Sequence, residues 1–232
     1  MNFKQCNPTN YRGGRRSPIQ FLVIHFTSND KDTAKNNVDY YANTANLNAS
    51  AHYYVDSSEV WQSVSDSDTA WHCGATTYKH NACRNDNSIG IELCSRYTGN
   101  IKADKAANTV DFKKYYFDDA VVKNAAKLVR DLMKKYNIPI SNIIRHYDVT
   151  GKTCPAPFVI DEAQWKEFLG MLSANDKKLE SGNDIVWELM NGKHKVEIGD
   201  VKRAVSALDK AKNSQEFLSL YWILYKIVNG ND

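Results

Sequence analysis

The most compact apolar run in the chain is Ile19-Gln20-Phe21-Leu22-Val23-Ile24-His25. A short apolar run that ends in a polar residue predicts a strand buried on both faces of a sheet. This strand would deliver the imidazole of His25 to one edge of the sheet. Spacing alone does not decide whether that imidazole is a hydrogen-bonded structural group or a functional one.

Further strands and helices are predicted around this run. Residues 88–94 alternate, so that Ile89, Ile91 and Leu93 face one way while Glu92 faces the other. Residues 142–145 predict a short strand that runs into His146. Other strands are expected at residues 51–55 and 59–64, and helices at residues 30–42, 117–136 and 162–172. We expect Pro139 to stop the helix at 117–136. The fold class is therefore α/β, with a mixed central sheet flanked by helices.

Length and composition suggest one main domain with a small appendage. The chain has 232 residues, of which 42% are hydrophobic and 25% charged, an ordinary globular composition. After residue 174 the sequence becomes polar, so residues 175–183 are expected to be a linker. Residues 184–232 show amphipathic helical patterns and predict a small helical domain.

Charge and apolar runs argue against several classes of partner. The net charge is +3, and the densest basic stretch, Arg12 to Arg16, predicts a solvated loop rather than a nucleic-acid-binding arm. No apolar run is long enough to cross a membrane. No apolar segment follows Met1, so we expect no secretory signal peptide and a cytoplasmic protein. Cys73 and Cys83 are expected to be free thiols there, although an oxidising medium would allow them to pair.

Three residues stand out as metal ligands: His25, His146 and Cys154. Two imidazoles and a thiolate suit zinc, and three protein ligands leave the fourth tetrahedral position for water. Zinc lowers the pKa of such a water molecule and polarises a bound carbonyl. Spacing alone leaves the alternatives open, because nothing local joins His25 to His146 and a single cysteine is often a small buried apolar residue.

Several short segments, in order along the chain, resemble a known family. They are His25-Phe26-Thr27, residues 50–55, residues 70–74, residues 87–93, residues 146–148 and residues 152–155. Residues 19–158 as a whole resemble the type 2 N-acetylmuramoyl-L-alanine amidases, whose fold is shared with phage lysozyme-amidases and peptidoglycan recognition proteins. The resemblance implies that residues 1–174 are a catalytic domain with one catalytic zinc ion, held by His25, His146 and Cys154.

The resemblance also implies roles for other residues. Glu92 would act as the general base that passes a proton to the leaving amine. Lys152 would steady the oxyanion. Without a catalytic role, Glu92 would be an exposed carboxylate on a strand and Lys152 a surface lysine. The segment containing Trp71 and His72 would line the substrate cleft, and for His72 a purely structural role is equally open. One branch of the family has a tyrosine where this chain has Ala51, so the proton transfer is expected to fall on Glu92.

The implied reaction is hydrolysis of the amide between N-acetylmuramic acid and L-alanine in bacterial peptidoglycan. A cytoplasmic wall hydrolase fits a phage endolysin or autolysin that is released to the cell wall, and residues 184–232 would then bind the wall. The alternatives are a cytoplasmic muropeptide-recycling amidase and a non-catalytic peptidoglycan-binding protein. The C-terminal helices could instead stabilise the chain or form a dimer. Asp148 could accept a hydrogen bond from a ligand histidine or cap the turn that follows it.

Overall fold

The computed structural model describes residues 1–173. Within these residues, the strands of the central sheet lie in the order β1-β5-β4-β7-β3-β10. Their bounds are Asn2–Phe3 (β1), Val60–Gln62 (β5), Tyr53–Val55 (β4), Ser88–Leu93 (β7), Phe21–Phe26 (β3) and Ile143–Arg145 (β10). The predicted linker at 175–183 and helical domain at 184–232 lie outside the described residues.

The sheet is mixed, as predicted. β3 pairs in parallel with both β7 and β10, and β4 pairs in parallel with β7 but antiparallel with β5. All six residues of β3 are buried. Leu22 and Ile24 enter the largest apolar cluster on one face, whereas Val23 packs in a second cluster on the other. Burying an aliphatic side chain of this size contributes about 1.5–3 kcal/mol, so the apolar run that predicted the strand also anchors it.

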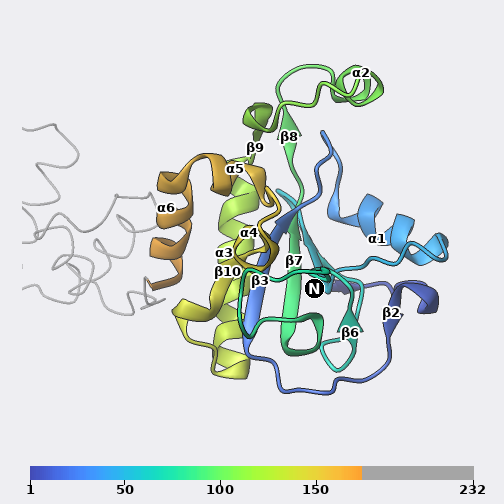
Figure 1. The fold of residues 1–232 in the computed structure, drawn as a ribbon, viewed down its shortest axis with the longest axis vertical. Helices are drawn as coiled ribbons and strands as arrows, with labels where there is room; N and C mark the ends of the chain where they lie inside the picture. Colours follow the sequence, from blue (N-terminus) through green and yellow to red (C-terminus); the bar gives the residue numbers. More distant parts are fainter. Residues whose placement is uncertain (174–232) are drawn as a thin grey trace, which may run out of the picture. The chain divides into compact units, whose positions relative to one another are not determined.

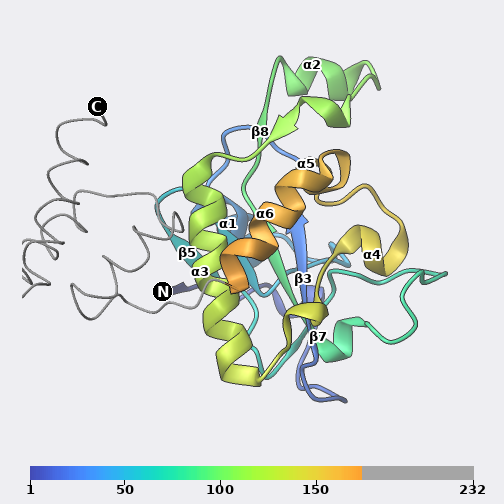
Figure 2. The same cartoon turned by 90° about the vertical axis from the view of Figure 1, so that its left-hand side faces the viewer.

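Helices cover both faces of the sheet (Figures 1 and 2). Their bounds are Ala34–Asn43 (α1), Ile101–Ala106 (α2), Asp119–Tyr136 (α3), His146–Thr150 (α4), Ala156–Ile160 (α5) and Glu162–Ser173 (α6). In Figure 1, α3 and α6 lie on one side of β3 and β7, and α1 lies on the other. The α/β class with helices flanking a mixed sheet is confirmed for the described residues. No helix among them is long and apolar enough to cross a membrane.

Helix α3 ends at the predicted residue, but Pro139 is not the cause. The helix ends at Tyr136, and Asn137 follows in the left-handed conformation with φ 51°. Asparagine tolerates this conformation and is a common residue at helix C-termini. The helix therefore stops before Pro139, and the proline only starts the short 3-10 helix η4 (Ile140–Asn142). Pro139 is not the residue that ends the helix.

A long excursion connects β7 to α3. It contains the antiparallel pair β8 (Arg96–Tyr97) and β9 (Tyr115–Tyr116), with α2 and the 3-10 helix η3 (Phe112–Lys114) between them. Figure 1 shows this segment standing above the sheet, and we call residues 96–116 the arm. A second small pair joins β2 (Tyr11–Arg12) to β6 (Thr69–Ala70), flanked by the 3-10 helices η1 (Pro8–Asn10) and η2 (Asn85–Asn87).

Candidate metal centre

Three adjacent parallel strands place the key side chains in one row. In the register of β3 and β7, His25 lies opposite Glu92. In the register of β3 and β10, Arg145 lies opposite Ile24, so the next residue, His146, continues alongside His25. Parallel strands bring their carboxyl ends to the same edge of a sheet, and this is the edge at which open α/β sheets bind ligands. His146 also starts α4, which turns its backbone away from the sheet.

The loop after α4 returns the chain to this edge. Gly151 ends the helix with φ 85°, a left-handed conformation that favours glycine. The backbone N–H of Tyr147 then donates to the carbonyl of Cys154 at 2.8 Å, which closes the loop beside the start of the helix. This closure places the Cys154 side chain next to His25 and His146, eight residues and one tight turn after the second histidine.

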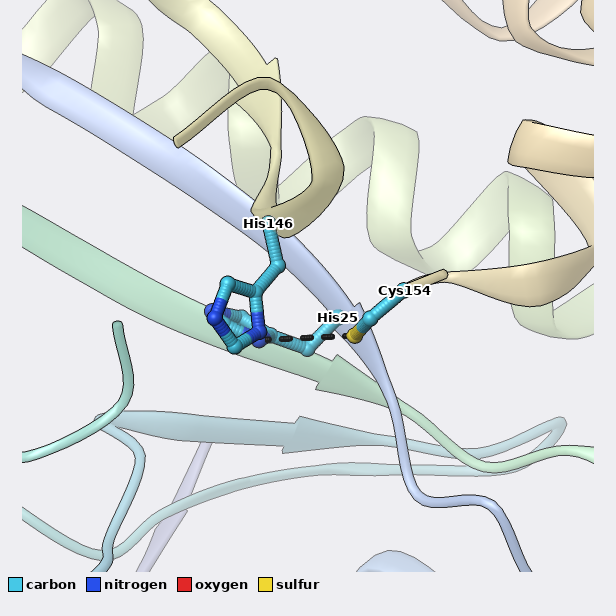
Figure 3. Close-up of side chains that lie close together, drawn as sticks. All are labelled: His25, His146 and Cys154. Atoms are coloured by element: carbon cyan, nitrogen blue, oxygen red, sulfur yellow. Dashed lines mark hydrogen bonds between the residues drawn. The ribbon is translucent and has the colours of Figure 1, made fainter. Parts of the chain in front are cut away.

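His25, His146 and Cys154 form a compact cluster (Figure 3). Their ligand atoms all lie within 4.8 Å of one another, and the side chains are buried, with exposed fractions of 2%, 7% and 4%. The Nδ1 atom of His25 lies 3.7 Å from the Sγ atom of Cys154. A tetrahedral zinc ion, with Zn–N bonds of about 2.1 Å and a Zn–S bond of about 2.3 Å, separates such ligands by about 3.6 Å. The donor set and its spacing therefore fit zinc.

Burial prepares the two histidines for this role. It lowers the pKa of His25 well below the usual value, and the neighbouring His146 lowers it further. Burial also lowers the pKa of His146 to about 3, with a smaller contribution from Lys152. Both imidazoles are therefore neutral near pH 7, the form that binds a metal. Burial raises the pKa of the Cys154 thiol, so that metal binding would release its proton.

Glu92 lies beside the cluster without a hydrogen-bonding partner on one oxygen. Its Oε2 atom is buried and makes no hydrogen bond within the described residues. Burial raises the pKa of Glu92 to about 8, against the lowering effect of the Lys152 charge. A buried carboxyl group whose pKa lies near neutrality can both accept and release a proton, which is the property of a general base.

A cleft opens over the cluster. Its lining includes all five predicted ligand and catalytic residues together with Trp71 and His72, so the structure brings the predicted site residues together. A neighbouring hollow shares Trp71, His72, His146 and Lys152, and extends the cleft towards Gly74 and Asn85.

Two aromatic residues of the cleft, Tyr41 and Phe112, were not among the predicted site residues. Tyr41 belongs to the helix predicted at residues 30–42, and Phe112 lies in the arm, for which no element had been predicted. Whether an aromatic side chain lines a cleft or packs in the core depends on the tertiary structure, so no local signal distinguished these two from core residues.

Two expectations about polar residues change. Asp148 accepts hydrogen bonds from the backbone N–H of Arg145 at 2.9 Å and from its guanidinium at 3.0 Å, so it caps the start of α4, and within residues 1–173 it makes no hydrogen bond to a ligand histidine. The side chain of Arg15 is not simply solvated, in contrast to the prediction for this stretch. Its guanidinium donates to the carbonyl of Ser88 at 3.0 Å and contacts His52 at 2.7 Å. All the cysteines among the described residues are free and buried.

The domain is thus an α/β domain whose sheet edge carries two histidines and a cysteine that could hold a metal ion. The family model for N-acetylmuramoyl-L-alanine amidase matches residues 15–157. The chain belongs to this family.

Individual relatives agree with this assignment. The chain is 33% identical over 177 residues to the N-acetylmuramoyl-L-alanine amidase CwlL of Bacillus licheniformis, covering 72% of this chain and 44% of the relative. It is 31% identical over 167 residues to the N-acetylmuramoyl-L-alanine amidase CwlH of Bacillus subtilis, covering 71% and 57%. The chain thus spans about half the length of these curated relatives.

Solved structures show the same fold. The structure of PlyL aligns with a TM-score of 0.58 and 28% identity, covering 76% of this chain and 98% of PlyL. A mutant endolysin from Bacillus subtilis aligns with a TM-score of 0.57 and 25% identity, covering 74% and 97%. The described domain therefore corresponds to nearly the whole of each of these two chains.

Proposed function

We propose that this chain is a zinc-dependent peptidoglycan hydrolase that cleaves the amide between N-acetylmuramic acid and L-alanine. The single observation that carries this proposal is the cluster of His25, His146 and Cys154 beside Glu92, at the bottom of a cleft, in a chain of the amidase family. Zinc would be held by the two histidines and the cysteine, and would supply a Lewis acid that polarises the carbonyl and makes water nucleophilic near pH 7.

The chain's own residues would handle the protons and the charge. Glu92 accepts the proton that the attacking water loses and delivers it to the nitrogen of L-alanine as the C–N bond breaks. Lys152, which is exposed at the rim and lines the cleft, stabilises the negative charge on the carbonyl oxygen. The products are the carboxylic acid of the lactyl group and the free amine of the peptide.

The cleft would hold the sugar and the peptide through its aromatic walls. Trp71 lines both parts of the cleft, and the backbone N–H of Trp71 donates to Ser50 Oγ at 3.0 Å, which fixes its position. A rigid ring can stack against a sugar face at little entropic cost. His72 contributes the surface beside it. These two residues are therefore the proposed substrate contacts.

The biological setting is a proposal of the same kind. The similarity to an endolysin supports the role of a phage endolysin or autolysin. Residues 184–232 would then bind the wall, and this part of the proposal lies outside the described residues.

The decisive experiment digests purified walls with the full chain and identifies the new chain ends. A new free amine on L-alanine, lost after chelation and restored by zinc, is the expected result. A new reducing sugar would point to a glycosidase, and digestion that persists in excess chelator would overturn the metal mechanism. Binding to walls without any new end would identify a non-catalytic peptidoglycan-binding protein.

A further inference from the structure

A chain of hydrogen bonds leads from a backbone carbonyl to the metal cluster. The hydroxyl of Ser88 donates to the carbonyl of Arg84 at 2.6 Å. The same oxygen lies 3.1 Å from Nε2 of His72. Nδ1 of His72 in turn lies 3.0 Å from Nε2 of His25. Both ring nitrogens of His72 are thus engaged by protein atoms.

The carbonyl of Arg84 fixes which atom donates in each of these hydrogen bonds. A carbonyl can only accept, and a hydroxyl has a single proton, so Ser88 uses its proton on Arg84 and must accept from His72. His72 then carries its proton on Nε2. A neutral imidazole with a proton on Nε2 accepts at Nδ1, so Nε2 of His25 must donate to it.

The consequence for His25 concerns its other nitrogen. With the proton on Nε2, the lone pair of His25 is on Nδ1. Nδ1 is the atom that lies 3.7 Å from Cys154 Sγ, on the side of the ring that faces the cluster. The opposite tautomer would place a proton there and block coordination.

We propose that His72 and Ser88 are positioning residues, which hold His25 in the tautomer and orientation that bind zinc through Nδ1. This inference rests on the proposed function, because it takes zinc as the ion in the cluster. Groups that hold the second nitrogen of a metal-binding histidine raise its affinity for the metal, and their loss typically costs about 10- to 100-fold.

The packing around His72 supports a fixed ring. A Cβ atom at Gly90 would lie 2.5 Å from Cγ of His72, so the ring occupies space that only glycine leaves open. The rings of His25 and His72 meet edge to face with centroids 5.1 Å apart, and the ring of His52 also meets the ring of His72 edge to face, at 5.7 Å. The ring of His72 therefore has little freedom to turn away from His25.

The test measures the zinc dissociation constant of the full chain by competition with a chromogenic chelator. His72→Asn keeps an amide oxygen near the position of Nδ1 and should stay within about threefold of wild type. His72→Gln places its polar atoms near Nε2, out of reach of His25, and should weaken binding by about 10- to 100-fold, as should His72→Ala. His80→Ala is the matched control: among the described residues the hydrogen bonds of the His80 ring go only to backbone N–H groups of its own loop, at Ala82 and Cys83, so the constant should stay unchanged.

A second measurement needs no variant. Long-range proton–nitrogen NMR of the metal-free wild type should show His25 protonated at Nε2. Protonation at Nδ1 overturns the inference, as does wild-type zinc affinity in folded His72→Gln. A wild-type chain that binds no zinc at all overturns the proposed function instead, and so the two failures are distinguishable.

Discussion

Gly90→Ala should displace the ring of His72. The added Cβ would lie 2.5 Å from Cγ of His72, and 2.8 Å from Cδ2 and Nδ1. Carbon atoms in contact lie about 3.5–4.0 Å apart, so the ring must move by about 1.0–1.5 Å. A movement of that size lengthens the 3.0 Å contact between His72 and His25 beyond the range of a hydrogen bond.

The expected cost follows from overpacking, which destabilises by about 1–3 kcal/mol. For a domain of this size that corresponds to a fall in the melting temperature of about 2–12 °C. Calorimetry of the metal-free chain measures this fall, and the chelator competition measures the accompanying loss of zinc affinity. Gly13→Ala is the control, because nothing lies within 4 Å of a Cβ at that position.

A double-mutant cycle separates this clash from a general effect on the strand. In a His72→Ala background the ring is absent, so Gly90→Ala should cost little or even stabilise, since alanine restricts the unfolded chain more than glycine does. An equal loss of stability in both backgrounds would refute the steric reasoning.

Three further changes test other parts of the molecule. Glu92→Ala should leave zinc bound but lower turnover by more than about 100-fold, measured as release of L-alanine amines; near-normal hydrolysis would remove Glu92 from the mechanism. Phe112→Ala should lower kcat/KM by about 3- to 10-fold and leave zinc affinity unchanged, because Phe112 lines the cleft. Tyr116→Ala is the control in the same arm, outside the cleft lining, and should leave kcat/KM unchanged. An equal fall in kcat/KM for both variants would contradict a substrate contact by Phe112. Asp56→Asn should cost about 1.5–3 kcal/mol at pH 7, because the carboxylate accepts three backbone N–H groups. Burial opposes ionisation of Asp56, yet these hydrogen bonds lower its pKa overall, so its contribution is present above about pH 4 and is lost as the pH falls through the lower folded pKa. Urea unfolding at pH 7 and pH 3 measures the difference, and an equal cost at both pH values would contradict the reasoning.

Local patterns predicted the parts of the site that lie on single strands. The alternation in residues 88–94 correctly placed Glu92 on the face opposite Ile89 and Ile91, because strand periodicity is a property of neighbouring residues. The buried run before His25 was equally local. Local patterns could not predict that His25 and His146 are adjacent, because this depends on the pairing of β3 with β10. Only the family resemblance linked the two histidines.

Contacts between segments without a repeating pattern could not be predicted. The hydrogen bond between His72 and His25 depends on the path of a loop and on the missing side chain at Gly90. Arg15 looked like a solvated residue because most of its partners are backbone carbonyls, which carry no signal in the sequence. The end of α3 was predicted at the correct residue but from the wrong signal: Asn137 and Pro139 both signal a stop, and Asn137, which lies nearer, ends the helix.

The lengths of the strands have a consequence for behaviour at high concentration. The central strands β3 and β7 each have six residues, whereas the outermost strands β1 and β10 have two and three. Unpaired backbone groups on a long edge strand can recruit another copy of the sheet and start aggregation. In the described domain, each outer edge offers only a few such groups. Short edge strands therefore disfavour edge-to-edge aggregation of this domain at high protein concentration.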